Sequence, residues 1–92
     1  MIIYAMAHHI KPLVIIGVKG VTEQLLNSVD VALNDHELIK VKFSDFKESK
    51  KEISEEIAEA TNSERVGLIG NIAIFYRQQP DPGKRKFKIS NK

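Results

Sequence analysis

Apolar and polar residues alternate along this chain in short blocks, each with the spacing of one kind of secondary structure. Residues 13–16 (LVII) form a continuous apolar run between a proline and a glycine, which predicts a short strand buried on both faces. From residue 22 onward the spacing is helical: Thr22 can cap a helix, and Glu23 suits its first turn. The apolar face of this helix comprises Leu25, Leu26, Val29, Ala32 and Leu33. Residues 34–37 (NDHE) end it.

Two further stretches have the pattern of strands. Residues 37–43 (ELIKVKF) alternate, so that Ile39, Val41 and Phe43 share one face and Leu38 shares the other with two lysines. This predicts a strand with one buried and one wet face. Residues 64–77 (ERVGLIGNIAIFYR) contain two strand-like runs around Gly-Asn. Both turn residues tolerate positive φ, which predicts a two-residue β-hairpin.

Between these stretches, residues 44–62 return to helical spacing. The apolar side of this second helix comprises Phe46, Ile53, Ile57 and Ala60. The opposite side is nearly all Lys and Glu at spacings of three and four, which indicates a solvated face. Two capping boxes compete for its start, Asp45 with Glu48 and Ser49 with Glu52.

The order of these elements predicts the fold class. We expect residues 1–10 to form a short helical stretch that Pro12 stops. The chain then runs α-β-α-β-α-β-β, an α/β (α+β) fold with helices packed against a mixed four-stranded sheet. The crossovers from the first strand to the second and from the second to the third are long enough for parallel pairing. The final hairpin adds an antiparallel pair.

Length and composition limit the organisation of the chain. Its 92 residues suit one domain, which we place at residues 1–79, followed by a basic tail at 80–92. Residues 84–92 hold five of the 14 Lys and Arg residues and none of the 12 Asp and Glu, so the rest of the chain has a net charge of −3. Such a tail suits nucleic acid, but it also suits solubility alone. The absence of cysteine excludes disulfides and cysteine-based metal sites.

The remaining sequence features favour a soluble cytoplasmic protein without an enzymatic role. There is no run of about 18 apolar residues, and residues 1–9 lack the pattern of a signal peptide. His8 and His9 are adjacent, so on a helix they point about 100° apart, and His36 has no ligand partner at zinc spacing. We therefore expect no metal and no cofactor. The Glu-rich helix and the serines show no catalytic pattern.

The strongest candidate for binding is the GVKG stretch at residues 17–20. It joins the first strand to a helix N-terminus, where unpaired N–H groups and the helix dipole attract anions. Gly17 and Gly20 permit a tight turn, and Lys19 adds a full positive charge. The stretch lacks the glycine spacing of a P-loop or a dinucleotide fingerprint. It predicts either a phosphate-contacting loop or an ordinary turn with an exposed lysine.

Several spaced motifs resemble those of the CRM domain family (chloroplast RNA splicing and ribosome maturation), whose stand-alone bacterial members are YhbY-like proteins. The similar pieces are Ala7-His8, Lys11-Pro12, the run from Gly17 to Thr22, the run from His36 to Lys42, and the hairpin ending in Tyr76-Arg77. The resemblance covers about residues 5–79. It implies helices on one side of a mixed four-stranded sheet, as in the C-terminal domain of bacterial translation initiation factor three. It also implies a GxxG loop similar to that of KH domains, which clamps the nucleic-acid backbone.

The resemblance further implies RNA as the partner. Stand-alone bacterial members associate with precursors of the large ribosomal subunit, whereas plant relatives with several copies assist group II intron splicing. One copy favours ribosomal RNA and a role in ribosome assembly, with no membrane or small-molecule substrate, and we expect a monomer. The expected RNA-binding residues are Gly17, Val18, Lys19, Gly20, Thr22, Lys11, Arg77, Lys84, Arg85 and Lys86. The family pattern implies that Arg77 lies near the GxxG loop, where it either contacts RNA or pairs with an acid.

The sequence departs from the family at its beginning, and other functions stay open. Relatives have a longer, basic first helix, so here either that helix is short or the chain lacks its natural start and part of its RNA-binding face. Few exposed aromatic residues are predicted, so we expect little base stacking and modest sequence specificity. One alternative is a protein-interaction module that uses the acidic helix or the apolar N-terminus. Another is a splicing-type RNA cofactor.

Overall fold

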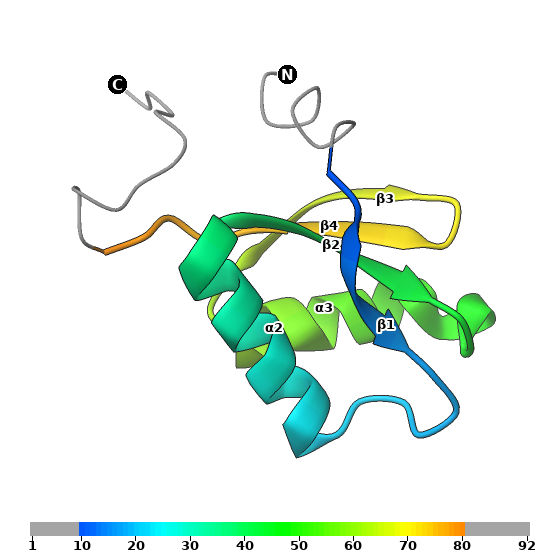
Figure 1. Ribbon diagram of the computed structural model, residues 1–92. Coiled ribbons are helices and arrows are strands. Elements are labelled where there is room, and N and C mark those ends of the chain that lie inside the picture. The colour runs from blue at the N-terminus through cyan, green and yellow to red at the C-terminus, as the bar shows by residue number, and fades with distance from the viewer. Residues whose placement is uncertain (1–9, 81–92) are drawn as a thin grey trace.

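The computed structural model describes residues 10–80, which form two α-helices and a four-stranded sheet (Figure 1). The strands are β1 (Pro12–Ile16), β2 (Leu38–Phe43), β3 (Glu64–Ile69) and β4 (Ile72–Tyr76). The helices are α2 (Glu23–His36) and α3 (Lys50–Ala60), and a single 3₁₀ turn, η1 (Lys47–Ser49), leads into α3. The mixed α+β fold predicted from the sequence is confirmed for this part of the chain. The helix predicted at residues 1–10 lies almost wholly outside the described residues.

The strands lie in the order β1-β2-β4-β3. β1 and β2 are parallel, as predicted, whereas β4 pairs antiparallel with both β2 and β3. The expected pairing of the second strand with the third is therefore wrong, because the hairpin inserts its last strand between them. Burial agrees with this order: Ala73, Ile74 and Phe75 are consecutive buried residues, so both faces of β4 are covered, as is typical of a central strand. β3 has a register shift and no fully buried residue, and it occupies the edge.

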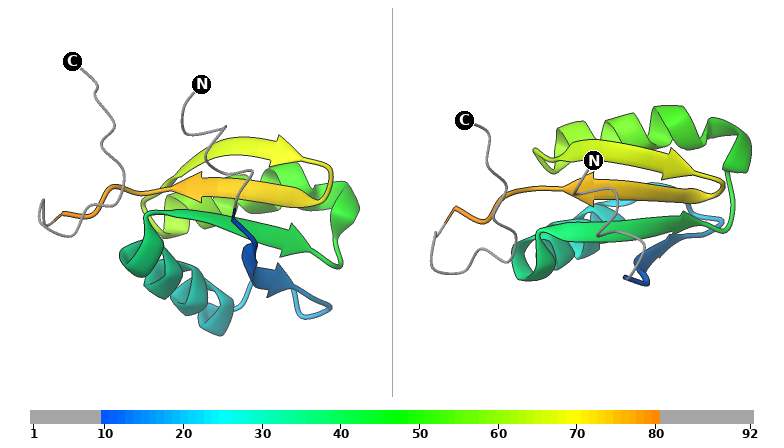
Figure 2. Two further views of the ribbon diagram at one scale, coloured as in Figure 1. Left: turned by 45° about the horizontal axis from the view of Figure 1, so that its top comes forward. Right: turned by 90° about the horizontal axis from the view of Figure 1, so that it is seen from above.

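Both helices pack on one face of the sheet, as the right-hand view of Figure 2 shows. α2 packs under β1 and β2, and α3 packs under β3 and β4. The core between the layers comprises Val14, Ile16, Val29, Leu33, Ile39, Val41, Phe43, Ile57, Ala73 and Phe75. The predicted alternation of β2 is confirmed, although Leu38 is also buried, in a second cluster with Ile74 on the other face.

The prediction that the first strand is buried on both faces is wrong. Val14 and Ile16 point into the core, but the side chains of Leu13 and Ile15 are 52% and 61% exposed. The reason is topological, because β1 is an edge strand and no described element covers Leu13 and Ile15. Leu13 and Ile15 therefore lie on the face of the sheet opposite the helices.

The predicted ends of α2 agree with the structure. The backbone N–H of Leu25 donates to Thr22 Oγ1 at 3.0 Å, so Thr22 is the N-cap, and Glu23 lies in the first turn. The helix ends after His36, where Glu37 turns the chain with a φ of 66° and donates its backbone N–H to the Leu33 carbonyl at 2.9 Å. Thr22 thus fixes the start of the helix directly after the GVKG stretch.

The start of α3 differs from both predicted capping boxes. Ser49 precedes the helix but makes no side-chain capping bond. Asp45 Oδ1 instead accepts the backbone N–H of Phe46 at 2.8 Å, and Phe46 adopts a left-handed conformation with a φ of 56°. Phe46 therefore lies outside the helix and is 41% exposed, so its predicted place on the apolar helix face is wrong. Asp45 stabilises a turn that competes with helix formation at this point.

The predicted hairpin is confirmed between β3 and β4. Gly70 has a φ of 57°, but Asn71 is not in the positive-φ region, so only the first turn residue needs glycine-like freedom, as in a type II′ turn. Lys50 Nζ donates to the Gly70 carbonyl at 2.5 Å and thereby ties the turn to the start of α3. Within residues 10–80, no helix has the length and apolar character needed to cross a membrane.

Candidate functional site

The GVKG stretch folds as one tight turn between β1 and α2. The backbone N–H of Gly20 donates to the Gly17 carbonyl at 3.0 Å, which closes a four-residue turn. Neither Val18 nor Lys19 has positive φ, as in a type I turn, whereas Gly20 has a φ of 67°. Val18 is 79% exposed, and Lys19 is also exposed. The two glycines therefore differ, because only Gly20 has the left-handed conformation that favours glycine.

A second loop, residues 44–46, supports this turn from the β2 side. The backbone N–H groups of Ser44 and Asp45 both donate to the carbonyl of Ile16, at 3.0 and 3.1 Å. The ring of Phe46 lies against Gly20, and a Cβ at residue 20 would be 3.3 Å from Phe46 Cε2. At Gly17, by contrast, an added Cβ would meet no protein atom within 4 Å. The turn is thus packed at Gly20 and open at Gly17.

The position of the turn gives it a positive electrostatic character. It leads directly into α2, whose first N–H groups and dipole create partial positive charge. Thr22 satisfies one of these groups through its hydroxyl, and Glu23 offsets part of the dipole. Lys19 adds a mobile ammonium group at the same end. The acidic helix α3 lies under the other half of the sheet, beneath β3 and β4. An anion such as a phosphate group can therefore be held at this turn.

An open groove extends from the turn along the side of α2. Its first part has a volume of about 500 Å³ and is lined by the turn, by β1 and by the first half of α2. Its second part, of about 450 Å³, continues along α2 to His36. Leu13, Val14, Gln24 and Ser28 line both parts, which makes the groove continuous. Thr22, Val18 and Lys19 are in its first part.

Other predicted binding residues do not lie at the turn. Lys11 is exposed directly before β1, and Gly17 directly follows that strand. At about 3.3 Å per residue, the strand separates them by about 20 Å. Lys84, Arg85 and Lys86 lie outside the described residues. Residues 10–80 contain no group of His, Asp and Glu side chains that could hold a metal ion.

Arg77 lies at the opposite end of the sheet from the turn. Figure 1 shows the segment after β4, in orange, on the left and the connection from β1 to α2 at the lower right. The expectation that Arg77 lies near the GxxG loop is therefore wrong. The cause is the direction of β4, which runs antiparallel to β2 and so ends where β2 begins.

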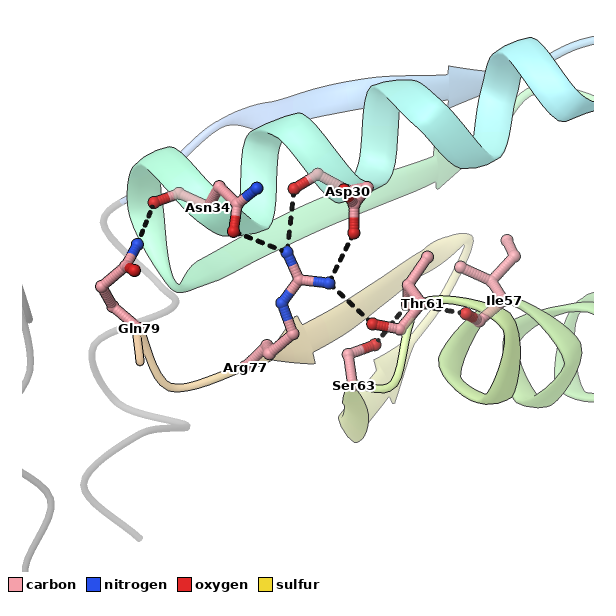
Figure 3. A network of polar contacts seen from close by, with 7 residues as sticks. All are labelled: Asp30, Asn34, Ile57, Thr61, Ser63, Arg77 and Gln79. Atoms are coloured by element: carbon pink, nitrogen blue, oxygen red, sulfur yellow. Dashed lines mark hydrogen bonds and ion pairs between the residues drawn. The ribbon is translucent and has the colours of Figure 1, made fainter. Parts of the chain in front are cut away.

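The guanidinium of Arg77 is engaged by the protein itself (Figure 3). Nη1 donates to Asp30 Oδ1 at 2.6 Å and to the Thr61 carbonyl at 2.7 Å. Nη2 donates to the Asp30 carbonyl and to Asn34 Oδ1, each at 3.0 Å. The side chain of Arg77 is only 18% exposed. Of the two predicted roles, pairing with an acid is the one that the structure shows.

Sequence reasoning missed two features of the site. The helical spacing predicts Phe46 on a helix, although the Asp-Phe sequence after a strand also suits a turn stabilised by the aspartate side chain. The groove was not predicted, because it depends on β1 lying at the edge of the sheet beside α2. The one available signal is Val31, an apolar residue that lies outside the predicted apolar face of α2; the structure shows it 58% exposed.

The fold and the turn define a small α+β domain with an exposed GxxG turn, residues 17–20, between β1 and α2. Residues 3–77 match the CRS1 / YhbY (CRM) domain, and the chain belongs to that family. A Pseudomonas aeruginosa protein named "Probable RNA-binding protein" is 38% identical over 87 residues, which cover 94% of this chain and 84% of the relative.

Two further comparisons agree with this family. A protein of Haemophilus influenzae named "RNA-binding protein" is 42% identical over 73 residues, which cover 78% of this chain and 74% of the relative. The solution structure of a candidate RNA-binding protein from Staphylococcus aureus superposes with a TM-score of 0.76 at 34% identity. That likeness covers 95% of this chain and 92% of the other.

Proposed function

We propose that this protein binds RNA and holds a phosphate of the RNA backbone at the turn formed by residues 17–20. The observation that carries the proposal is the closed turn, which presents Lys19 to solvent directly before the N-terminus of α2. Relatives that share the fold and the family are named as RNA-binding proteins. Phosphate contacts of this kind position a protein on nucleic acid and do not select a base sequence.

The two glycines of the turn differ in conformation and in surroundings, and this difference supports a contact between RNA and the protein backbone at the turn. The φ of Gly20 favours glycine for the shape of the turn, whereas Gly17 is not in the positive-φ region, and a Cβ added there would meet no protein atom within 4 Å. Glycine at such a position permits another molecule to approach the backbone closely. In the proposed complex, the RNA backbone comes close to Gly17, and Lys19 neutralises a phosphate.

The proposed target is ribosomal RNA in a precursor of the large subunit. This step rests on the resemblance to stand-alone bacterial CRM proteins. The protein would act in the cytoplasm during ribosome assembly, where it holds or shields an RNA fold without catalysing a reaction. Co-sedimentation tests this step: the protein should migrate with large-subunit precursors on a sucrose gradient. Migration with mature ribosomes alone, or with neither, would contradict it.

Fluorescence anisotropy with a large-subunit rRNA fragment tests RNA binding itself. Lys19→Gln removes the cation at the turn, and Lys51→Gln is the matched control, because Lys51 is an exposed lysine on the acidic helix α3. We expect Lys19→Gln to weaken binding about fivefold or more and to reduce the slope of log K against log[salt] by about 0.7. Lys51→Gln should leave both quantities unchanged. Equal effects of the two substitutions would show that the turn is not the binding site.

A further inference from the structure

β1 is an edge strand that carries no charged side chains. Among the described strands it pairs with β2 alone, and Figure 2 shows it, in blue, at one margin of the sheet. Residues 13–16 (LVII) are all aliphatic, and the side chains of Leu13 and Ile15 are 52% and 61% exposed. The other edge strand, β3, differs, because it includes Glu64 and Arg65. An exposed apolar edge without charged residues is a site where another strand can pair.

The main chain of β1 presents hydrogen-bonding groups that no described strand pairs. The Ile16 carbonyl accepts the backbone N–H groups of Ser44 and Asp45, so it points toward the β2 side. Main-chain groups of successive strand residues point to opposite sides, so those of Ile15 point away from β2. Pro12 has no N–H group, but it lies at the start of β1 and leaves the following residues free to pair. A strand added at this edge therefore meets main-chain groups and apolar side chains together.

A second copy of the chain is complementary to this edge. An antiparallel pairing of β1 with itself, centred on Val14, places Leu13 of each copy opposite Ile15 of the other. The same register places Lys11 opposite Gly17, so no two like charges lie directly opposite each other in the pair. Apolar cross-strand pairs stabilise a sheet, whereas like charges directly opposite destabilise it. The sequence of the strand thus fits a two-fold symmetric interface, in which one surface meets itself.

The groove on the helix side of the same edge adds electrostatic complementarity. It has Lys19 at the turn and Asp35 near the end of α2, and the rest of its lining, apart from His36, is uncharged. A two-fold axis through the centre of the paired strands makes the two α2 helices antiparallel. Lys19 of one copy then lies at the same end of the interface as Asp35 of the other, and the antiparallel helix dipoles attract each other. Val31, which is 58% exposed in the groove, adds apolar surface.

We propose that this protein forms a homodimer in which the β1 strands of two copies pair and join their sheets. Three observations favour a second copy as the partner: the uncharged strand, the register without opposed like charges, and the opposite charges at the two ends of the groove. The homodimer differs from the monomer expected from the sequence. Lys19 belongs both to this interface and to the proposed RNA contact, so a second copy and RNA compete for the turn. This competition alone rests on the proposed function.

Light scattering after size-exclusion chromatography, without RNA, tests the homodimer. We expect the mass of wild type to rise from that of one chain to that of two as the protein concentration increases. Ile15→Lys places two like charges close to the two-fold axis and should weaken dimerisation about tenfold or more. Ile69→Lys is the matched control and should have no effect, because Ile69 is 43% exposed on β3, at the other edge of the sheet. A monomer at every concentration, or loss of the dimer in Ile69→Lys alone, would overturn the proposal.

A charge exchange tests the antiparallel arrangement of the two copies. Lys19→Asp and Asp35→Lys should each weaken dimerisation about fivefold, because each places like charges at both ends of the interface. The double variant restores opposite charges and should recover most of the dimerisation of wild type. Unchanged dimerisation in both single variants, or no recovery in the double variant, would overturn this arrangement.

Addition of RNA separates this inference from the proposed function. A short rRNA fragment should convert wild-type dimers into complexes of one protein chain with one RNA molecule, measured by the same light scattering. Binding of RNA to an intact dimer would overturn the competition. If the dimer forms and RNA does not bind, the proposed function fails and the homodimer stands.

Discussion

Arg77 and Asp30 are 47 positions apart in the sequence, yet their side chains meet at 2.6 Å. The same guanidinium also binds the carbonyl of Thr61, which directly follows α3 (Figure 3). One side chain at the end of β4 therefore joins the two helices on the core side of the sheet. Arg77 stabilises the packing that positions α2, and α2 in turn carries the candidate site at its other end.

We predict that Arg77→Met lowers the free energy of unfolding by about 2 kcal/mol. The substitution keeps an apolar stem but leaves the Thr61 carbonyl and Asp30 without their charged donor, and hydrogen bonds to charged groups are the stronger ones. Urea unfolding followed by circular dichroism measures the change. RNA affinity, corrected for the folded fraction, should stay within about twofold of wild type. A large loss of affinity at unchanged stability would show instead that Arg77 contacts RNA.

The two glycines of the turn should respond differently to alanine. Gly20→Ala places a Cβ 3.3 Å from the Phe46 ring at a φ of 67°, so we expect it to destabilise the fold by about 1–2 kcal/mol. Gly17→Ala meets no protein atom within 4 Å and should change stability by less than about 0.5 kcal/mol. It should nevertheless weaken RNA binding, because the proposed RNA backbone approaches there. Thermal unfolding and anisotropy on both variants separate the effects. Undiminished RNA affinity in Gly17→Ala would contradict the close approach.

Phe46 offers a separate test of how the turn is supported. Phe46→Ala removes the ring from Gly20 but keeps a side chain in the left-handed conformation, whereas Phe46→Gly removes both the ring and the backbone strain. We therefore expect Phe46→Gly to be more stable than Phe46→Ala by about 1 kcal/mol. Both variants should weaken RNA binding to a similar extent, because both lose the support of the turn. Equal stability of the two would indicate that residue 46 is not strained.

Local sequence signals predicted those features that depend on neighbouring residues. Thr22 and Glu23 mark the start of α2, and Gly70 marks the hairpin turn, because each acts within its own segment. The alternation of Ile39, Val41 and Phe43 likewise gave the buried face of β2. The turn that carries Lys19 could also be predicted from the sequence, because the strand, the two glycines and the helix cap at Thr22 follow one another directly.

Features that depend on distant segments could not be predicted in this way. Local patterns do not show that β4 inserts between β2 and β3, because the lengths of the connections allow either order. The position of β4 between β2 and β3 brings Arg77 next to Asp30. β1 also has the composition of a buried strand, and only its edge position exposes Leu13 and Ile15. The groove follows from that position.

The basic tail should act independently of the turn. A chain ending at Gly83 loses five basic residues, so we expect weaker binding to every RNA and a smaller salt slope, since fewer counterions are released. The factor by which Lys19→Gln weakens binding should be the same in the truncated chain as in the full chain, because separate sites contribute additively. Anisotropy titrations of the four proteins, at matched salt, measure this double-mutant cycle. If Lys19→Gln has no effect once the tail is removed, the tail positions RNA on the turn, and the two must be treated as one binding unit.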